Sequence, residues 1–267
     1  MDNPLKKMIN KFGLPRIIIA GFFILLVIGA SAFQMNMPQF FGDILRRWGM
    51  FGILALAMVP AVQCGIGLNF GISMGIVGGL LGGIIVIQLN IAQNPSLVAI
   101  HPLFAAWVAI LVAILIGVVL ATGIGYLYGL LLNRVKGSEM TVTTYVGFSV
   151  IAFMNMVWML LPFDNGELIW PNAGKGMRNT ISLASSFSEV MNKTMAFGMG
   201  DFLFPTGLLL FFFLMCFLVW LFMRSKTGMA MTAAGANPMF AKAAGINVNK
   251  MRLIGTTIST VLAAVGI

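Results

Sequence analysis

Long apolar runs recur along the whole chain, and each is close to the length needed to cross a lipid bilayer. A helix takes about 20 apolar residues to span the hydrocarbon core. Only 9% of the residues are charged and 60% are hydrophobic, which leaves too few charges to cover a globular surface in water. The sequence therefore predicts an all-α, polytopic integral membrane helix bundle. The runs place its helices at residues 15–33, 48–64, 70–90, 104–132, 141–162, 202–223 and 253–267.

The last run, LIGTTISTVLAAVGI, is shorter than a full crossing and has no polar flank after it. No polar linker or block of charge divides the rest of the sequence. We therefore expect residues 1–267 to form a single transmembrane domain that is incomplete at its C-terminus.

The distribution of charge predicts the orientation of the helices. If the N-terminus is cytoplasmic and the helices alternate, eleven basic and two acidic residues fall inside, whereas five of each fall outside. The whole net charge of +9 then lies on the cytoplasmic side, as the positive-inside rule requires. This orientation makes residues 224–252 a cytoplasmic segment. No single basic cluster exists, so we do not expect a nucleic-acid site.

Glycines recur at every fourth residue of the stretch CGIGLNFGISMGIVGGLLGG, which begins at Cys64. Helices in a membrane associate through close packing, and small residues at this spacing let two backbones approach. We expect these glycines to form a packing face against another helix. They are Gly67, Gly71, Gly75, Gly79 and Gly83.

The same stretch predicts a broken helix near residues 64–70, because Gly65 and Gly67 interrupt the apolar run. Transporters use such breaks to build substrate sites, since the freed backbone groups must face protein or water. Asn69 beside the break has two interpretations: a hydrogen bond between helices, or an amide that lines a translocation path. Asn155, within the expected helix 141–162, has the same two. The candidate pathway residues are Gln63, Asn69, Phe70, Ser73 and Asn155.

The cytoplasmic segment contains signals for a short helix at 238–244. Asn237 is a favourable N-cap, Pro238 suits the first helical position, and Gly245 suits the C-terminal end. Met239 and Phe240 give this helix apolar side chains on the cytoplasmic side. It is either a capped turn within a loop or a docking element for a cytoplasmic partner.

The stretch GANPMFAKAAGINVNK, residues 235–250, resembles the cytoplasmic loop of inner-membrane permeases of bacterial ABC importers for ribose-type sugars. Related permeases for nucleosides and branched-chain amino acids have similar loops. The resemblance implies that this segment includes the coupling helix, which sits in a cleft of the ATPase subunit. The coupling residues implied here are Asn237, Pro238, Met239, Phe240, Ala241, Gly245 and Asn247.

A second resemblance lies at the break. Sugar permeases carry the pattern GGIDLSVG, whereas this chain has CGIGLNFG at residues 64–71. Gly67 replaces the aspartate of that pattern and Asn69 replaces its serine. The stretch Leu-Asn-Phe-Gly is closer to the pattern of the branched-chain amino-acid permeases.

The resemblance implies a permease subunit of an ABC importer in the bacterial inner membrane, which translocates a small polar solute. A sugar is the expected substrate, and a nucleoside or a branched-chain amino acid is the alternative. The implied partners are a cytoplasmic ABC ATPase, a second permease copy or paralogue, an extracytoplasmic solute-binding protein and membrane lipid.

We expect no cofactor, metal or catalytic residue in this chain, and ATP and Mg²⁺ to bind the ATPase. The chain has no phosphate-binding loop, because Gly174-Lys175-Gly176 lacks both the earlier glycine and the hydroxyl residue. An intramembrane enzyme or a secondary carrier would need ionisable groups at membrane depth. The expected spans have none away from their ends.

Overall fold

The computed structural model describes residues 13–161, 168, 187, 190–199 and 202–267, and almost all of the secondary structure in them is helical. The elements are α2 (Leu14–Ala32), α3 (Met37–Gln63), η1 (Phe70–Ile72), α4 (Ser73–Gln88), η2 (Ile91–Gln93), α5 (Pro95–Val98), α6 (Pro102–Arg134), α7 (Glu139–Leu160), α8 (Val190–Lys193), β1 (Phe197–Met199), β2 (Phe202–Phe204), α9 (Thr206–Met223), α10 (Lys226–Ala236), α11 (Pro238–Ala243) and α12 (Val248–Gly266).

Six stretches among the described residues form helices long and apolar enough to cross a membrane. They are Leu14–Ala32, Met37–Gln63, Phe70–Gln93, Leu103–Arg134, Glu139–Trp158 and Thr206–Met223. The prediction of an all-α, polytopic membrane helix bundle is therefore confirmed.

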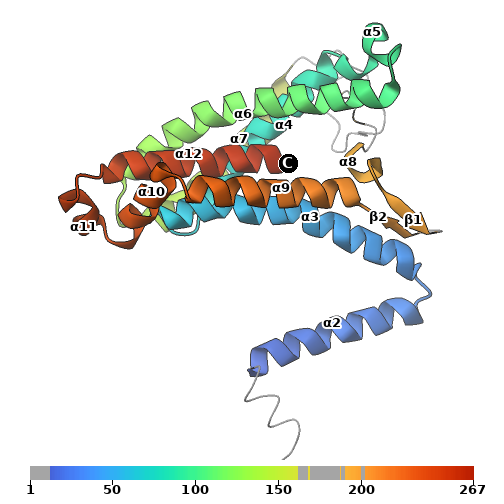
Figure 1. Cartoon of the computed structure of the whole chain (residues 1–267), viewed down its shortest axis with the longest axis horizontal. Helices are drawn as coiled ribbons and strands as arrows, with labels where there is room; N and C mark the ends of the chain where they lie inside the picture. Colours follow the sequence, from blue (N-terminus) through green and yellow to red (C-terminus); the bar gives the residue numbers. More distant parts are fainter. Residues whose placement is uncertain (1–12, 162–167, 169–186, 188–189, 200–201) are drawn as a thin grey trace, which may run out of the picture.

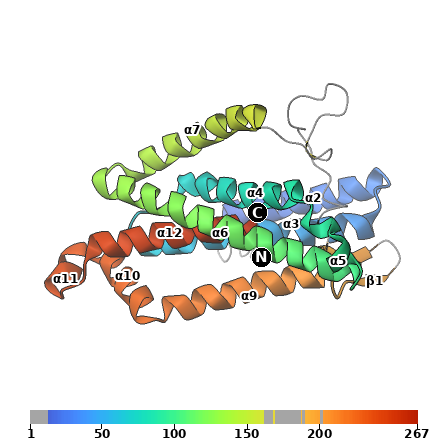
Figure 2. The ribbon, with the colours of Figure 1, turned by 90° about the horizontal axis from the view of Figure 1, so that it is seen from above.

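Helix α12 lies in the centre of the bundle, where it packs against α6, α3 and α4 (Figure 2). Its inward face combines small apolar residues with buried hydroxyl groups at Thr256, Ser259 and Thr260. Asn249, Lys250 and Arg252 at its N-terminal end lower its mean hydropathy, which explains why α12 is not among the six helices named above. It begins at Val248, five residues before the expected start at 253.

The two ends of the bundle differ in structure (Figure 1). Helices α10 and α11 lie at the end where α3, α6 and α9 finish. The hairpin of β1 and β2 lies at the opposite end with α5. Helix α2 stands apart from the other helices, and Ala30 is its one buried residue. Under the expected orientation, α10 and α11 form the cytoplasmic end.

Several elements differ from the expected bounds. Helix α3 begins at Met37 rather than at 48, because Asn36 caps it and Asp43 pairs with Arg46 within the helix. The expected span 202–223 begins instead at Thr206, after Pro205, and its first residues form β2. Helix α10 was not predicted, although Ser225 caps it by accepting a hydrogen bond from the Gly228 amide.

The predicted helix break is confirmed. Helix α3 ends at Gln63, and both Gly65 and Gly67 have positive φ angles, of 78° and 89°. Residues other than glycine rarely adopt this backbone conformation. The chain then forms the single turn η1 before α4 begins at Ser73. The apolar run is therefore split into two helices joined by an irregular segment.

Candidate functional site

Asn69 is the centre of the polar contacts at the break. Its carbonyl oxygen accepts hydrogen bonds from the Gly71 amide at 3.1 Å and from the Tyr128 hydroxyl at 2.8 Å. Its amide donates to the Ser259 hydroxyl at 3.0 Å. The side chain is 0% exposed. Asn69 thus connects the break to α6 and to α12, which corresponds to the first of its two interpretations, a hydrogen bond between helices.

Ser73 and the backbone of Phe70 connect the break to α7. The Ser73 hydroxyl donates to the Gly147 carbonyl at 3.2 Å. A Cβ atom at Gly147 would lie 2.7 Å from the Phe70 carbonyl oxygen, so glycine is needed for this approach. The break is therefore held on three sides, by α6, α7 and α12.

The glycines of α4 do not form one packing face. A side chain on Gly75 or Gly79 would collide with α12, whereas one on Gly82 would lie 2.5 Å from the Ala113 carbonyl of α6. A Cβ atom at Gly83 would meet no neighbouring element within 4 Å, and Gly67 lies in the turn before the helix. Successive positions of an i, i+4 series advance by about 40° around a helix of 3.6 residues per turn. The series therefore rotates away from α12, and Gly78 and Gly82 supply the contact with α6.

Three of the candidate pathway residues are exposed. Gln63, the last residue of α3, is exposed, and so is Phe70, at 45%. Asn155 is exposed on the open side of α7. Helix α7 diverges from its neighbours toward its C-terminal end (Figure 2). Phe148 of α7 is also exposed, at 70%.

Trp158 lies on the packed side of α7, against the apolar cluster that Ile84, Ile87 and Leu168 form. Helix α7 therefore has an open side, which includes Phe148, Ile151 and Asn155, and a packed side, which includes Trp158.

The predicted short helix is present as α11. Asn237 accepts a hydrogen bond from the Phe240 amide at 3.0 Å, and Pro238 occupies the first helical position. At the other end Gly245 has a φ angle of 82°, and the Ile246 amide bonds to the Ala241 carbonyl at 2.9 Å. Both ends of the helix are thus fixed by local hydrogen bonds.

The apolar side chains of α11 point in two directions. Ala241 is buried against Ala234 of α10 and Val248 of α12. Met239 and Phe240 are 84% and 68% exposed. Two large apolar side chains therefore stand free at the end of the bundle, on a short helix that is anchored from its other side.

The break and the cytoplasmic segment touch through two glycines. A Cβ atom at Gly65 would lie 2.9 Å from the Cα atom of Gly235 in α10. Next to this contact, Cys64 packs against Gly255 of α12. The break, α10 and α12 therefore meet at one place.

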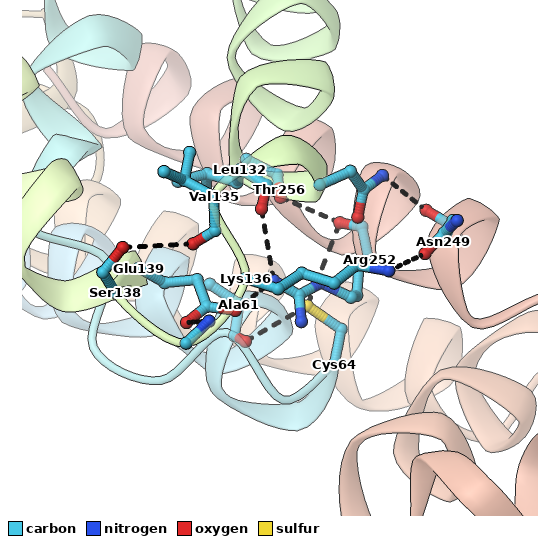
Figure 3. Close-up of polar contacts among 12 residues, drawn as sticks. Ala61, Cys64, Leu132, Val135, Lys136, Ser138, Glu139, Asn249, Arg252 and Thr256 are labelled. Carbon is cyan, nitrogen blue, oxygen red and sulfur yellow. Dashed lines mark hydrogen bonds and ion pairs between the residues drawn. The ribbon is translucent and has the colours of Figure 1, made fainter.

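A buried ion pair lies beside this place, and sequence reasoning missed it (Figure 3). Arg252 of α12 pairs with Glu139 at the start of α7, and their side chains are only 10% and 13% exposed. Arg252 also donates to the Leu132 carbonyl at 3.4 Å. One signal was available in the sequence. The two residues carry opposite charges, and both fall near the ends of expected spans on the same side of the membrane.

The fold and these contacts define a polytopic helical membrane protein with a broken core helix and an exposed, capped helix at one end. Residues 40–266 match the family model described as "Branched-chain amino acid transport system / permease component". The chain belongs to this family of ABC-transporter permeases, as the sequence resemblance predicted. Membership implies association in general with an ATPase and a binding protein. No curated protein and no solved structure matches the chain.

Proposed function

We propose that this chain is the permease subunit of an importer that carries a sugar across the bacterial inner membrane, driven by ATP hydrolysis in a separate subunit. The proposal rests mainly on the exposed side chain of Phe240 in α11. The Asn237 cap fixes this helix in place, so the phenyl ring is held in an exposed position. Folding of this chain alone does not account for an exposed aromatic side chain on such a helix. A pocket in a cytoplasmic ATPase accounts for it, because a buried aromatic residue can dominate binding.

In this proposal the solute moves along the open side of α7 and past the break. Asn155 supports this path, because an amide within a membrane span is unfavourable against lipid and requires protein or water. A second copy of the chain, or a paralogue, would close the path from the other side. Gln63 and Phe70 would line it near the break. Asn69 and Ser73 are buried, so they would not touch the solute but would hold the residues that line the path in position.

The chemistry of these side chains favours a sugar. The polar groups at the break and on α7 are amides and hydroxyls, which exchange hydrogen bonds with the hydroxyl groups of a sugar. The family description and the Leu68–Gly71 pattern favour a second candidate, a branched-chain amino acid. Uptake of labelled sugars, nucleosides and branched-chain amino acids by proteoliposomes that contain the full transporter separates these candidates. ATP-dependent uptake of leucine but of no sugar would contradict the first choice.

The docking role of α11 is tested by Phe240→Ala. We expect the variant to insert and fold normally but to lose the ATPase during purification, and to lose ATP hydrolysis that is stimulated by the binding protein. Met229→Ala is the matched control, because Met229 is also exposed, at 57%, but lies on α10. If the Phe240→Ala complex purifies with the wild-type stoichiometry and still couples hydrolysis to uptake, α11 is not the docking element.

A further inference from the structure

A group of polar side chains ties the start of α12 to the turn between α6 and α7. Besides the ion pair of Arg252 and Glu139, the Lys136 ammonium donates to the Asn249 side-chain oxygen at 2.6 Å. The Asn133 amide donates to the Asn249 backbone carbonyl at 2.9 Å. We call these five residues, Asn133, Lys136, Glu139, Asn249 and Arg252, the clasp. Figure 3 shows how Lys136, Glu139, Asn249 and Arg252 of this group lie relative to one another.

The clasp also fixes the turn between α6 and α7, through Glu139. One carboxylate oxygen of Glu139 binds Arg252, and the other accepts a hydrogen bond from the Gly137 amide at 2.8 Å. The charges suit the helix ends, because Glu139 lies at the N-terminus of α7 and Arg252 donates to the Leu132 carbonyl in the last turn of α6. The α6–α7 turn and the start of α12 therefore behave as one body while the clasp is closed.

The start of α12 is in turn rigidly joined to α11. Two asparagines cap the two helices in succession: Asn237 caps α11, and Asn247 caps α12 by accepting a hydrogen bond from the Lys250 amide at 3.0 Å. Only the turn around Gly245 separates the helices. A displacement of α11 thus also displaces Asn249 and Arg252, which lie in the first two turns of α12.

The break lies on the other side of Arg252. The Cys64 thiol is 3.1 Å from the Ala61 carbonyl and 4.0 Å from the Arg252 carbonyl. The start of α12 thus contacts both the break and, through the clasp, the turn that begins α7. These are the two structural elements that flank the proposed solute path.

A buried ion pair suits such a connection better than apolar packing does. Apolar residues of similar size often stabilise a fold as well as a buried pair does, whereas separating the two charges is strongly unfavourable. An ion pair therefore specifies one relative position of the elements it joins. The Arg252 Nε and Asn133 Oδ1 atoms are buried without a hydrogen-bond partner in the described part of the chain. They can form further bonds in a second arrangement of the same elements.

We propose that the clasp transmits movement of α11 to the α6–α7 turn and to the break, so that Glu139 and Arg252 are positioning residues for energy coupling. This inference rests on the proposed function, in which α11 docks on the ATPase. Neither residue touches the solute or the ATPase in this scheme. Their substitution therefore changes how much uptake follows from each ATP hydrolysed, and leaves the assembly of the complex unchanged.

The first experiment uses the full transporter in proteoliposomes with Glu139→Gln or Arg252→Gln. We expect normal amounts of bound ATPase, but a fall of at least about fivefold in uptake per ATP hydrolysed, the lower end of ordinary coupling between sites. The double variant recovers part of the ratio, because two amides can bond to each other and no buried charge is left unpaired. Lys250→Gln is the matched control, since Lys250 is exposed in the same turn of α12.

The second experiment separates transmission from simple stabilisation. Lys136 and Asn249 are changed to cysteine in the Glu139→Gln background and joined by a short bis-maleimide. A covalent link between the two elements should restore the ratio of uptake to hydrolysis. The same cysteine variants treated with a monofunctional maleimide should remain uncoupled.

The outcomes distinguish the clasp from the proposed function. If the wild-type chain neither binds an ATPase nor supports ATP-dependent uptake, the proposed function fails first. If the wild type couples and the single variants keep its ratio, the clasp does not transmit movement. The same conclusion holds if the loss of coupling disappears at temperatures where the variants are fully folded, or if the cross-link restores nothing.

Discussion

Replacing Asn69 by leucine should destabilise the protein, although the two side chains have similar size. The substitution removes the partner of the Gly71 amide, the Tyr128 hydroxyl and the Ser259 hydroxyl, all in a site that is 0% exposed. A buried polar group without a partner costs about 1–3 kcal/mol. The Tyr128 hydroxyl loses its acceptor and the Ser259 hydroxyl loses its donor, but both hydroxyls can rotate, whereas the Gly71 amide is fixed by the backbone.

Because polar contacts between membrane helices average only about 0.6 kcal/mol, we expect a total loss of about 2–4 kcal/mol rather than three full penalties. For a chain of this size, such a loss lowers Tm by roughly 5–10 °C. The assay is thermal unfolding of the detergent-solubilised chain, followed by size-exclusion chromatography after heating. We expect the break to lose its geometry, and uptake by the variant to fall along with its stability.

Asn155→Leu is the matched control, because it removes the same amide from an exposed position on α7. It should leave Tm unchanged and lower uptake, as expected of a residue that lines the path. The reasoning is refuted if Asn69→Leu melts at the wild-type temperature. It is also refuted if the two variants lose the same amount of stability.

Two further predictions concern packing and orientation. Gly75→Leu should prevent assembly of the bundle because its side chain would collide with α12, whereas Gly83→Leu should be tolerated because a Cβ atom at Gly83 would meet no neighbouring element within 4 Å. The yield of monodisperse chain after solubilisation measures both effects, and equal yields would contradict the packing. A cysteine at Lys242 should resist a membrane-impermeant thiol reagent applied to intact cells, and one at Ser96 should react, because the positive-inside rule places α11 in the cytoplasm and α5 outside. The reverse pattern of labelling would invert the topology.

The sequence predicts those features of the fold that depend on local chemistry. The caps at Asn237 and Gly245 lie within a few residues of the groups they satisfy, so the pattern of residue types was enough to locate α11. Gly65 and Gly67 predicted the break for the same reason, because a positive φ angle is a local preference.

The start of α3 and the presence of α10 were not predicted from the sequence. The expected helix began at residue 48, after Asp43 and Arg46, but these two residues pair with each other within a longer helix, α3, that Asn36 caps. Helix α10 contains Gly228 and Gly235, and each of these glycines allows a close approach to neighbouring backbone. The close approaches made by α10 depend on tertiary packing, which cannot be inferred from local preference.

The candidate site could be predicted only in part. Asn69 was identified as important, but its partners Tyr128 and Ser259 are 59 and 190 residues away along the chain. The ion pair of Glu139 and Arg252 joins residues 113 apart. Pairings over such separations depend on how the helices cross, and the apolar periodicity of a single helix does not determine its neighbours.

The contact between Gly65 and Gly235 also restricts how this sequence can change during evolution. A Cβ atom at either residue would occupy space taken by the backbone of the other. A mutation at one position cannot be compensated at the other, because glycine is already the smallest residue. A larger residue at one position is usually compensated by a smaller residue at its neighbour, and this compensation is not available here. A larger residue at either position requires the backbone of α10 or of the break to move. Substitutions at these two positions are therefore not compatible with the present backbone.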